Sequence, residues 1–136
     1  MDLVQSVLLV FVGGGIGSVC RFFITTTIGA RFGNFPFGTL AVNFLGGLFM
    51  GIIMGALLIL TDQKHLAHNP YRLMLTVGFL GGLTAFSSMS FETLMLYRGG
   101  STFLAVANIL INTFLSLGSV VFGLWFVRFV LGRLGF

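Results

Sequence analysis

Four polar side chains interrupt stretches of sequence that are otherwise almost wholly apolar. Asn108, Asn112 and Ser116 recur every four residues, so on a helix they share one face. Asn43 lies in the apolar run from Phe37 to Leu60. Amides and hydroxyls at membrane depth must face protein or water, where they either tie helices together or line a path for a polar species. A single asparagine favours the first role, whereas four such groups favour a lined pathway.

The segment GFLGGLTAFSSMSFE, from Gly78 to Glu92, carries the strongest local signal. Its glycines weaken a helix, and hydroxyl residues follow them at Thr84, Ser87, Ser88 and Ser90. A helix broken within a membrane survives only where its freed main-chain groups are buried or bind an ion. Freed carbonyls suit a cation, and freed amides suit an anion. The alternative is an intact helix with a glycine-rich packing face.

Carboxylates are scarce where these polar groups lie. Glu92 is the only acidic residue in a long apolar segment, since Asp2 and Asp62 lie in the N-terminus and in a polar loop. Proton-coupled exporters need a titratable group in the membrane, and cation channels usually show acidic rings or a carbonyl filter. Hydrogen-bond donors and the positive edges of aromatic rings instead stabilise a small, unreactive anion. With no nucleophile–base pair and no metal cluster in the sequence, we expect no enzyme.

The composition requires a membrane around these groups. Of 136 residues, 57% are hydrophobic, 17 are phenylalanine and only 7% are charged, against about 25% in an average soluble domain. This excludes a soluble enzyme and a disordered chain. The net charge of +4 comes from single, scattered basic residues, so we expect no binding to nucleic acid. Cys20 is the only cysteine, which excludes an intramolecular disulfide, and we interpret it as an inert core residue.

The apolar segments that must position the polar groups run over residues 4–28, 37–60, 71–97 and 103–130. Each exceeds the roughly 20 residues that a helix needs to cross the hydrocarbon core, and none alternates as a barrel strand does. The sequence predicts an all-α integral membrane protein, with four transmembrane helices in a single domain over residues 1–136. Glycines four apart, such as Gly13 and Gly17, predict close packing between the helices.

The positive charges give no clear orientation in the membrane. Four spans place both termini on one side, which carries four Lys or Arg, whereas the other side carries three. The four are Lys64, Arg72, Arg128 and Arg133, and the three are Arg21, Arg31 and Arg98. Orientation follows Lys/Arg asymmetry. Either one or two dominant charges set a single orientation, or copies insert both ways up and pair antiparallel, and the charges leave both readings open.

Three motifs, spread over nearly the whole chain, together resemble the Fluc family of fluoride channels, also called CrcB proteins. They are GGGIGSVCR from Gly13, PFGTLAVNFLGGLFMG from Pro36 and GFLGGLTAFSSMSFE from Gly78. The resemblance implies an antiparallel, dual-topology homodimer with two fluoride pores and a third helix broken in mid-membrane. It also implies a central sodium ion, structural and not transported, held by main-chain carbonyls of Gly81 and Thr84 in both subunits.

The resemblance further implies which residues form the fluoride pore. Asn43 matches the family's pore asparagine, and Phe86 matches its first pore phenylalanine. The second phenylalanine falls at Met89, whose polarisable side chain of similar reach is compatible with a pore but alters the anion contacts. The other residues expected along the pore are Thr39, Ser88, Asn108, Asn112 and Ser116. Arg21 and Glu92 are expected at its vestibules.

The expected function is passive export of cytoplasmic fluoride across the inner membrane of a bacterium. Its expected partners are fluoride, membrane lipid and a second copy of the chain. Fluoride enters from acid surroundings as neutral HF and dissociates in the more alkaline cytoplasm, and a channel lets the anion leave down the membrane potential. About 100 mV corresponds to roughly 2.3 kcal/mol per charge, or about fifty-fold in concentration.

Two other functions compete with this expectation. One is a small dual-topology exporter of cationic compounds, of the small multidrug resistance kind. Such exporters resemble one another by a membrane glutamate in the first helix, which residues 4–28 lack. The other is a non-transporting assembly subunit. It would explain the glycine spacing but not the polar stripe formed by Asn108, Asn112 and Ser116.

Overall fold

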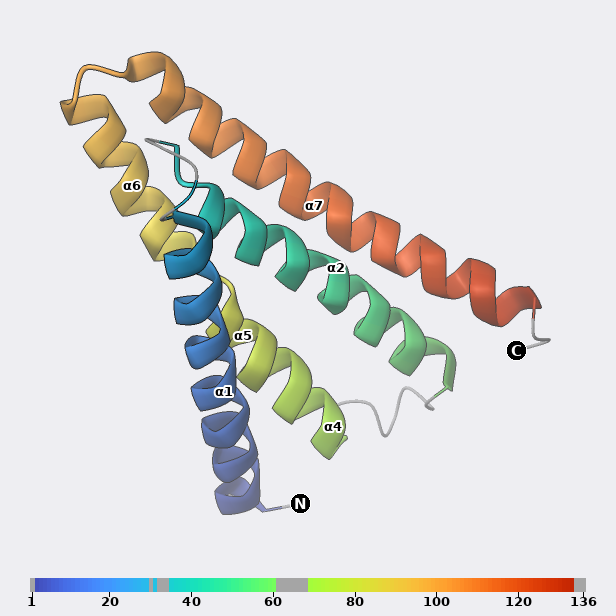
Figure 1. Cartoon of the computed structure of the whole chain (residues 1–136). Helices are drawn as coiled ribbons and strands as arrows, with labels where there is room; N and C mark the ends of the chain where they lie inside the picture. Colours follow the sequence, from blue (N-terminus) through green and yellow to red (C-terminus); the bar gives the residue numbers. More distant parts are fainter. Residues whose placement is uncertain (1, 30, 32–34, 61–68, 134–136) are drawn as a thin grey trace.

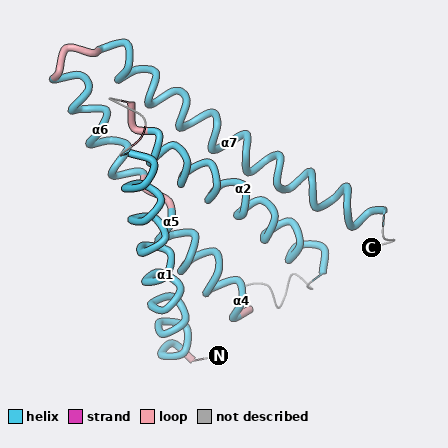
Figure 2. The backbone as a smooth tube through the Cα atoms, in the orientation of Figure 1, coloured by secondary structure: helices cyan, strands magenta, loops and turns pink. Residues whose placement is uncertain are grey.

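The computed structural model describes residues 2–29, 31, 35–60 and 69–133, and all regular structure within these ranges is helical (Figures 1 and 2). The helices in chain order are α1 (Leu3–Gly29), α2 (Phe37–Leu60), α4 (Pro70–Arg72), the π-helix η1 (Leu73–Leu80), α5 (Gly81–Leu83), α6 (Phe86–Arg98) and α7 (Thr102–Arg133). Within the described ranges four helical stretches are long and apolar enough to cross a membrane: α1, α2, Pro70–Arg98 and α7. The prediction of an all-helical chain with four such helices is therefore confirmed. Lys64, which entered the charge count, lies outside the described residues.

The helices form two arms that diverge from the end where α6 leads into α7 (Figure 1). In one arm α1 packs along η1 and α5, and in the other α2 packs along α7. The third span contributes to both arms, because its first half lies on α1 whereas α6 packs against α7. The two residues between α5 and α6 therefore connect the arms.

Glycines let the helices of each arm touch backbone to backbone. A Cβ atom at Gly17 of α1 would overlap the carbonyl oxygen of Phe79 in η1, and one at Gly51 of α2 would overlap the carbonyl oxygen of Val120 in α7. A main-chain carbonyl cannot swing aside as a flexible side chain can, so a larger residue at either position would separate the helices. The close packing predicted from the glycine spacing is present in both arms.

The third span leaves helical geometry for two residues. Thr84 is extended (φ −73°, ψ 153°), Ala85 has φ −143° and ψ 70°, and α6 begins at Phe86. We call Thr84 and Ala85 the break. Immediately before α5, η1 forms a π-helix of eight residues, which the sequence did not predict. π-Helical geometry is rare and is found frequently at functional sites.

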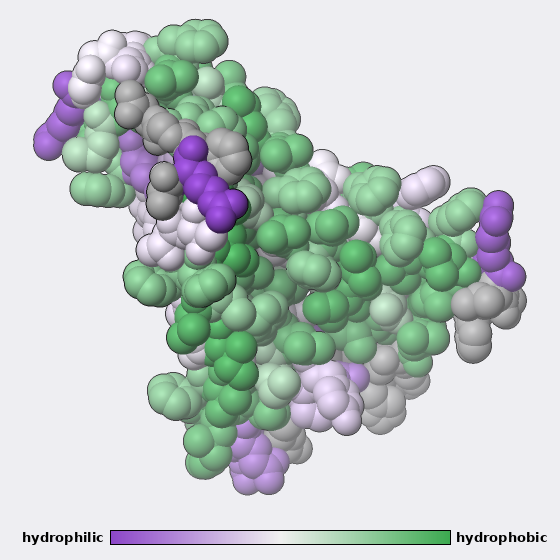
Figure 3. All heavy atoms as spheres, viewed as in Figure 1, coloured by the Kyte–Doolittle hydropathy of each residue, from purple (hydrophilic) through white to green (hydrophobic). Residues whose placement is uncertain are grey.

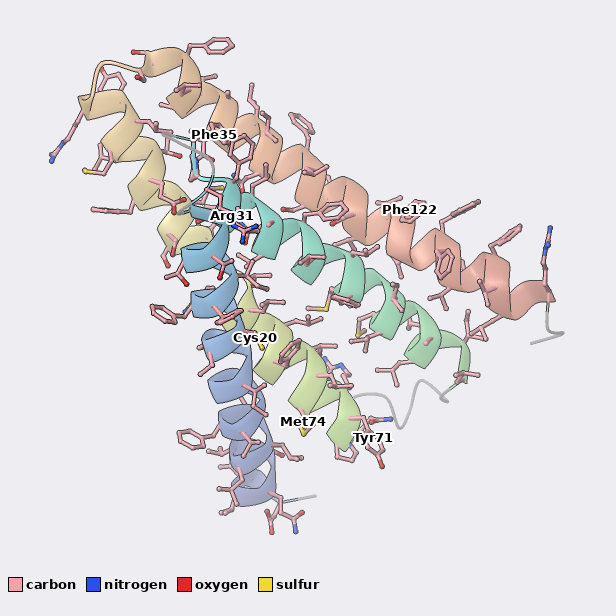
Figure 4. The ribbon with its side chains drawn as sticks, viewed as in Figure 1. Cys20, Arg31, Phe35, Tyr71, Met74 and Phe122 are labelled. Carbon is pink, nitrogen blue, oxygen red and sulfur yellow. The ribbon has the colours of Figure 1, made fainter. Side chains whose placement is uncertain are left out.

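The most buried apolar side chains gather around the break. Val42, Leu80, Leu83 and Ala85 are each at most 3% exposed. Cys20 of α1 packs against this cluster, on the side of α1 that faces the third span (Figure 4). The break therefore lies in the core of the subunit.

Most of the outer surface is apolar (Figure 3). On the face shown, hydrophobic residues cover the middle of both arms and strongly hydrophilic residues lie toward their ends. Phe11 is 76% exposed and Phe103 is 83% exposed, and Phe122 projects from the outer side of α7 (Figure 4). Large apolar side chains exposed over such an area suit hydrocarbon better than water. This surface is that of a multi-pass membrane protein.

Candidate functional site

Asn43 caps the broken end of the third span. The main-chain N–H of Ala85, just before α6, donates to Oδ1 of Asn43 on α2 at 2.8 Å. In an unbroken helix this N–H would donate to the carbonyl of Gly81, four residues earlier. Ala85 is the N-cap residue of α6, and an amide from another helix accepts its own N–H. Asn43 therefore stabilises the break and leaves the Gly81 carbonyl without its usual helical partner.

The same amide begins a series of hydrogen bonds through α2, α7 and α6. Nδ2 of Asn43 donates to Oδ1 of Asn112 at 2.9 Å, and Nδ2 of Asn112 donates to Oδ1 of Asn108 at 2.8 Å. Nδ2 of Asn108 donates to Oγ1 of Thr93 at 2.9 Å, and that hydroxyl donates to the carbonyl of Met89 at 2.8 Å. We call the three asparagines together with Thr93 the asparagine chain. Because Asn108 and Asn112 are at most 1% exposed, the chain joins three helices inside the subunit.

A cavity of about 380 Å³ lies beside Asn43. Its walls are formed by Asn43, Gly46, Gly47, Met50, Thr84, Phe86, Met89, Asn112, Thr113, Ser116 and Val120. None of these residues is charged, and the polar ones carry amides or hydroxyls. Since a water molecule occupies about 30 Å³ in the liquid, the cavity has room for a small ion with several waters.

The two positions expected to carry pore side chains on α6 differ in burial. Met89 is 5% exposed, whereas Phe86 is 76% exposed, although both border the cavity. They are three residues apart, which places them on neighbouring positions of one helix face. Met89 therefore closes the inner wall of the cavity, and the ring of Phe86 lies at its open side, on the surface of the subunit.

Arg21 of α1 reaches the break from the other side. Its Nη1 donates to the main-chain carbonyl of Thr84 at 3.2 Å, and its side chain is half-buried. Among the described residues no carboxylate forms an ion pair with Arg21. An unpaired guanidinium at this depth gives the region around the break a positive potential.

Glu92 lies in a separate polar site on α6. The hydroxyl of Thr39 donates to Oε1 of Glu92 at 2.6 Å, and Oε2 is buried without a hydrogen-bond partner within the described part of the chain. A second cavity, of about 340 Å³, is bordered by Glu92 together with Pro36, Phe91, Met95, Leu96, Gly99 and Ser101. Thr39 and Glu92 are therefore close to each other and form no part of the wall of the first cavity.

The structure thus separates the residues predicted for the pore. Those that border the first cavity are Asn43, Phe86, Met89, Asn112 and Ser116, and Thr84, predicted as a sodium ligand, borders it as well. Asn108 lies behind Asn112 in the asparagine chain, and Ser88 and Gly81 border neither of the two cavities.

Two polar residues of the site were not predicted. Thr93 ends the asparagine chain, and Thr113 borders the first cavity. Thr113 directly follows Asn112, and Thr93 directly follows Glu92, so adjacency was the only signal in the sequence. Threonines in membrane helices commonly bond to their own helix, as Thr93 also does, and the residue type alone does not reveal a second partner.

Comparison with known proteins decides the family. A family model described as CrcB-like protein, Camphor Resistance (CrcB), matches residues 8–124. The chain belongs to the CrcB family. This confirms the resemblance drawn from the three motifs, and it places α2, the third span and most of α1 and α7 within the matched region.

Several relatives of this CrcB protein carry the same name, fluoride-specific ion channel FluC. The one from Serratia proteamaculans is 42% identical over 110 residues, which cover 81% of this chain and 84% of the relative. Those from Pseudoalteromonas translucida and Phocaeicola vulgatus are 39% and 42% identical, and each aligns over 97% of its own length. The last two alignments therefore span nearly the whole length of each relative.

Proposed function

We propose that the protein is a fluoride channel that passively exports fluoride from the cytoplasm. The observation that carries the proposal is the cavity beside Asn43, in a chain whose relatives are named fluoride-specific ion channels. The mostly apolar wall of the cavity carries a few amide and hydroxyl residues and no charged side chain. Fluoride is small and strongly hydrated, so a path must replace its water with hydrogen-bond donors. The expected location is the inner membrane of a bacterium.

The path runs along the cavity wall formed by Asn43, Phe86, Met89 and Ser116. Asn43 offers an amide donor, and Phe86 offers the positive edge of its ring. Met89 stands where the family has a second ring, and its sulfur and methyl group form a softer wall. Arg21 attracts the anion toward the break, and Thr39 with Glu92 forms a polar site about midway along α6.

The working unit is an antiparallel homodimer. Phe86 is 76% exposed and lies at the open side of the cavity, so a second copy is needed to close the path around it. The near balance of positive charge between the two sides of the membrane allows copies to insert in both orientations. Two copies related in this way provide two pores.

A structural sodium ion joins the two breaks. The carbonyl of Gly81 lacks its usual helical partner because Ala85 donates to Asn43, and the extended conformation of Thr84 turns its carbonyl away from the helix. The Thr84 carbonyl accepts one bond from Arg21 and keeps a second lone pair. Hard cations prefer oxygen ligands of this kind. The main-chain carbonyls of both residues, from two subunits, would hold the ion and so fix the geometry of the breaks.

A growth test in cells addresses the export function. A bacterium without its own fluoride exporter should survive added fluoride when it makes this protein, and the protection should be greater in acid medium, where more HF enters. A variant with Gly17→Leu, which forces the first arm apart, is a control for expression without a folded channel. Equal survival in fluoride with and without the wild-type protein would contradict the proposal.

A further inference from the structure

Asn108 and Asn112 have no amide hydrogen left for an anion. Nδ2 of Asn112 donates both to Oδ1 of Asn108 at 2.8 Å and to the main-chain carbonyl of Asn108 at 3.1 Å. Nδ2 of Asn108 donates to Oγ1 of Thr93 at 2.9 Å and to the carbonyl of Met89 at 3.4 Å. Each amide carries two N–H groups, so both residues have used their donors within the protein. Their burial, at most 1% exposed, agrees with this.

Asn43 differs from them. One of its N–H groups donates to Asn112, and the other has no protein acceptor within the described ranges. Asn43 also borders the cavity and is 9% exposed, the most of the three asparagines. The remaining N–H of Asn43 is therefore the amide donor that the asparagine chain leaves available to the cavity.

Two neighbours determine which way the Asn43 amide faces. The N–H of Ala85 requires the oxygen of Asn43 on its side, and Oδ1 of Asn112 requires the nitrogen on the other side. A 180° flip would break both bonds and turn the oxygen toward the cavity, where it would repel an anion. Asn112 is in turn oriented by Asn108, and Asn108 by Thr93, so the orientation of Asn43 depends on residues that do not touch the cavity.

The hydrogen bonds also run in one direction and return to the helix where they began. They start at the main-chain N–H of Ala85, pass through the asparagine chain and end at the carbonyl of Met89, which lies one turn further along α6. Bonds arranged head to tail polarise one another, so an amide that accepts one is a stronger donor in the next. The chain thus both orients the Asn43 amide and strengthens its donor.

We propose that Asn112, Asn108 and Thr93 are positioning residues, which hold the Asn43 amide with one N–H directed into the cavity to contact the anion. This inference rests on the proposed fluoride path, but it assigns Asn108 and Asn112 of α7 a different role from contacting the anion. These two residues act through Asn43, and Asn43 makes the contact.

Thr93 gives the sharpest test, because it is remote from the cavity wall. Thr93→Val removes the hydroxyl at constant shape, whereas Thr93→Ser keeps the hydroxyl and removes a methyl group. Fluoride efflux from liposomes is measured over a range of fluoride concentrations. We expect Thr93→Val to raise the half-saturating concentration about three-fold and Thr93→Ser to restore it. Asn112→Leu should raise it about ten-fold, which corresponds to about 1.4 kcal/mol. Ser119→Ala, which removes another buried hydroxyl bond of α7, is the matched control and should change nothing.

Side-chain amide NMR separates positioning from loss of packing. The chain has five asparagines, so protein labelled with ¹⁵N-asparagine gives few signals, and Asn43→Ser assigns the pair from Asn43. Without fluoride, the two Asn43 protons should differ widely in chemical shift in the wild type and in Thr93→Ser, and should converge in Thr93→Val and Asn112→Leu. Fluoride should shift one of the two protons selectively in the wild type.

Unchanged Asn43 signals in both Thr93→Val and Asn112→Leu would overturn the positioning role. Equal loss of affinity in Thr93→Val and Thr93→Ser would do so as well, because packing alone would then explain it. If the wild type gives no fluoride efflux, the proposed channel function fails, while the fluoride-free comparison of Asn43 signals still decides whether the chain orients the amide.

Discussion

Replacing Asn43 with alanine should loosen the break. The amide makes two buried hydrogen bonds, one with the N–H of Ala85 and one with Oδ1 of Asn112. A buried polar group left without a partner costs about 1–3 kcal/mol, so two such groups would cost about 2–6 kcal/mol. The shorter alanine side chain would extend the neighbouring cavity of about 380 Å³, which Asn112 already borders, and water entering it would offset part of this cost. We therefore expect the lower end of the range, a loss of about 2 kcal/mol in the free energy of unfolding.

The same substitution removes the proposed fluoride donor. A hydrogen bond to a charged group contributes about 1.5–3 kcal/mol, and each 1.4 kcal/mol corresponds to about tenfold in rate. The Asn43→Ala channel should therefore conduct about ten to a hundred times more slowly. Asn43→Asp is the matched variant, because it has the same shape and still accepts from Ala85, but it offers no donor and adds a negative charge. Its second carboxylate oxygen faces Oδ1 of Asn112 in a buried site, so it should be at least as destabilised as Asn43→Ala and lose at least as much efflux.

Three measurements on the purified proteins test both roles of Asn43, in stability and in conduction. Thermal unfolding followed by circular dichroism reports stability, gel filtration reports assembly, and the initial rate of fluoride efflux from liposomes at equal protein density reports conduction. Wild-type efflux in Asn43→Asp would show that a charge at this position does not meet the ion, and the path would have to lie elsewhere. An unchanged melting temperature in Asn43→Ala would show that the amide does not stabilise the break.

Other substitutions test the remaining parts of the site. Phe86→Ile should cut fluoride efflux severely, because it removes the ring edge at the open side of the cavity. Met89→Phe should be tolerated, because it restores the family's ring. Normal efflux in Phe86→Ile together with no efflux in Met89→Phe would show that other residues line the path. Gly81→Leu should abolish dimer assembly as measured by gel filtration, because its side chain would crowd the carbonyls. Thr84→Ala should affect assembly only mildly, because only the main-chain carbonyl would bind sodium. Equal effects of the two substitutions would exclude a main-chain site. Two lysines added to the segment Ala30–Pro36 should force a single orientation, which a cysteine-labelling assay would detect. Cells that make this form alone should show no fluoride efflux. Full efflux from such cells would contradict the antiparallel dimer.

The helices could be predicted from the sequence because membrane crossing depends on length and apolar composition alone. Glycines followed by hydroxyl residues between Gly78 and Glu92 indicated an irregular segment, and Thr84 and Ala85 within it are not helical. The π-helix η1 was not predicted, because its apolar composition is the same as that of the other spans. Local composition therefore indicated a weak point in the third span but not its geometry.

The partners of the polar residues could not be predicted in the same way. The four-residue spacing placed Asn108 and Asn112 on one face, but an amide can bind an ion or another amide equally well. Only the crossing of α2, α6 and α7 shows that the asparagines bond to one another and that Asn43 retains a donor. The contact between Arg21 and the Thr84 carbonyl likewise joins residues far apart in the chain. Such pairings depend on tertiary structure, which a single sequence does not display.

Ion-selective efflux tests the central claim most directly. Liposomes containing the purified protein are loaded with potassium fluoride or potassium chloride, and an ionophore for potassium balances the charge as an electrode records the released anion. We expect rapid fluoride release that is absent when the protein is omitted, and chloride release no faster than from empty liposomes. Fluoride release at the rate of empty liposomes, from protein that elutes as a folded dimer, would contradict the claim.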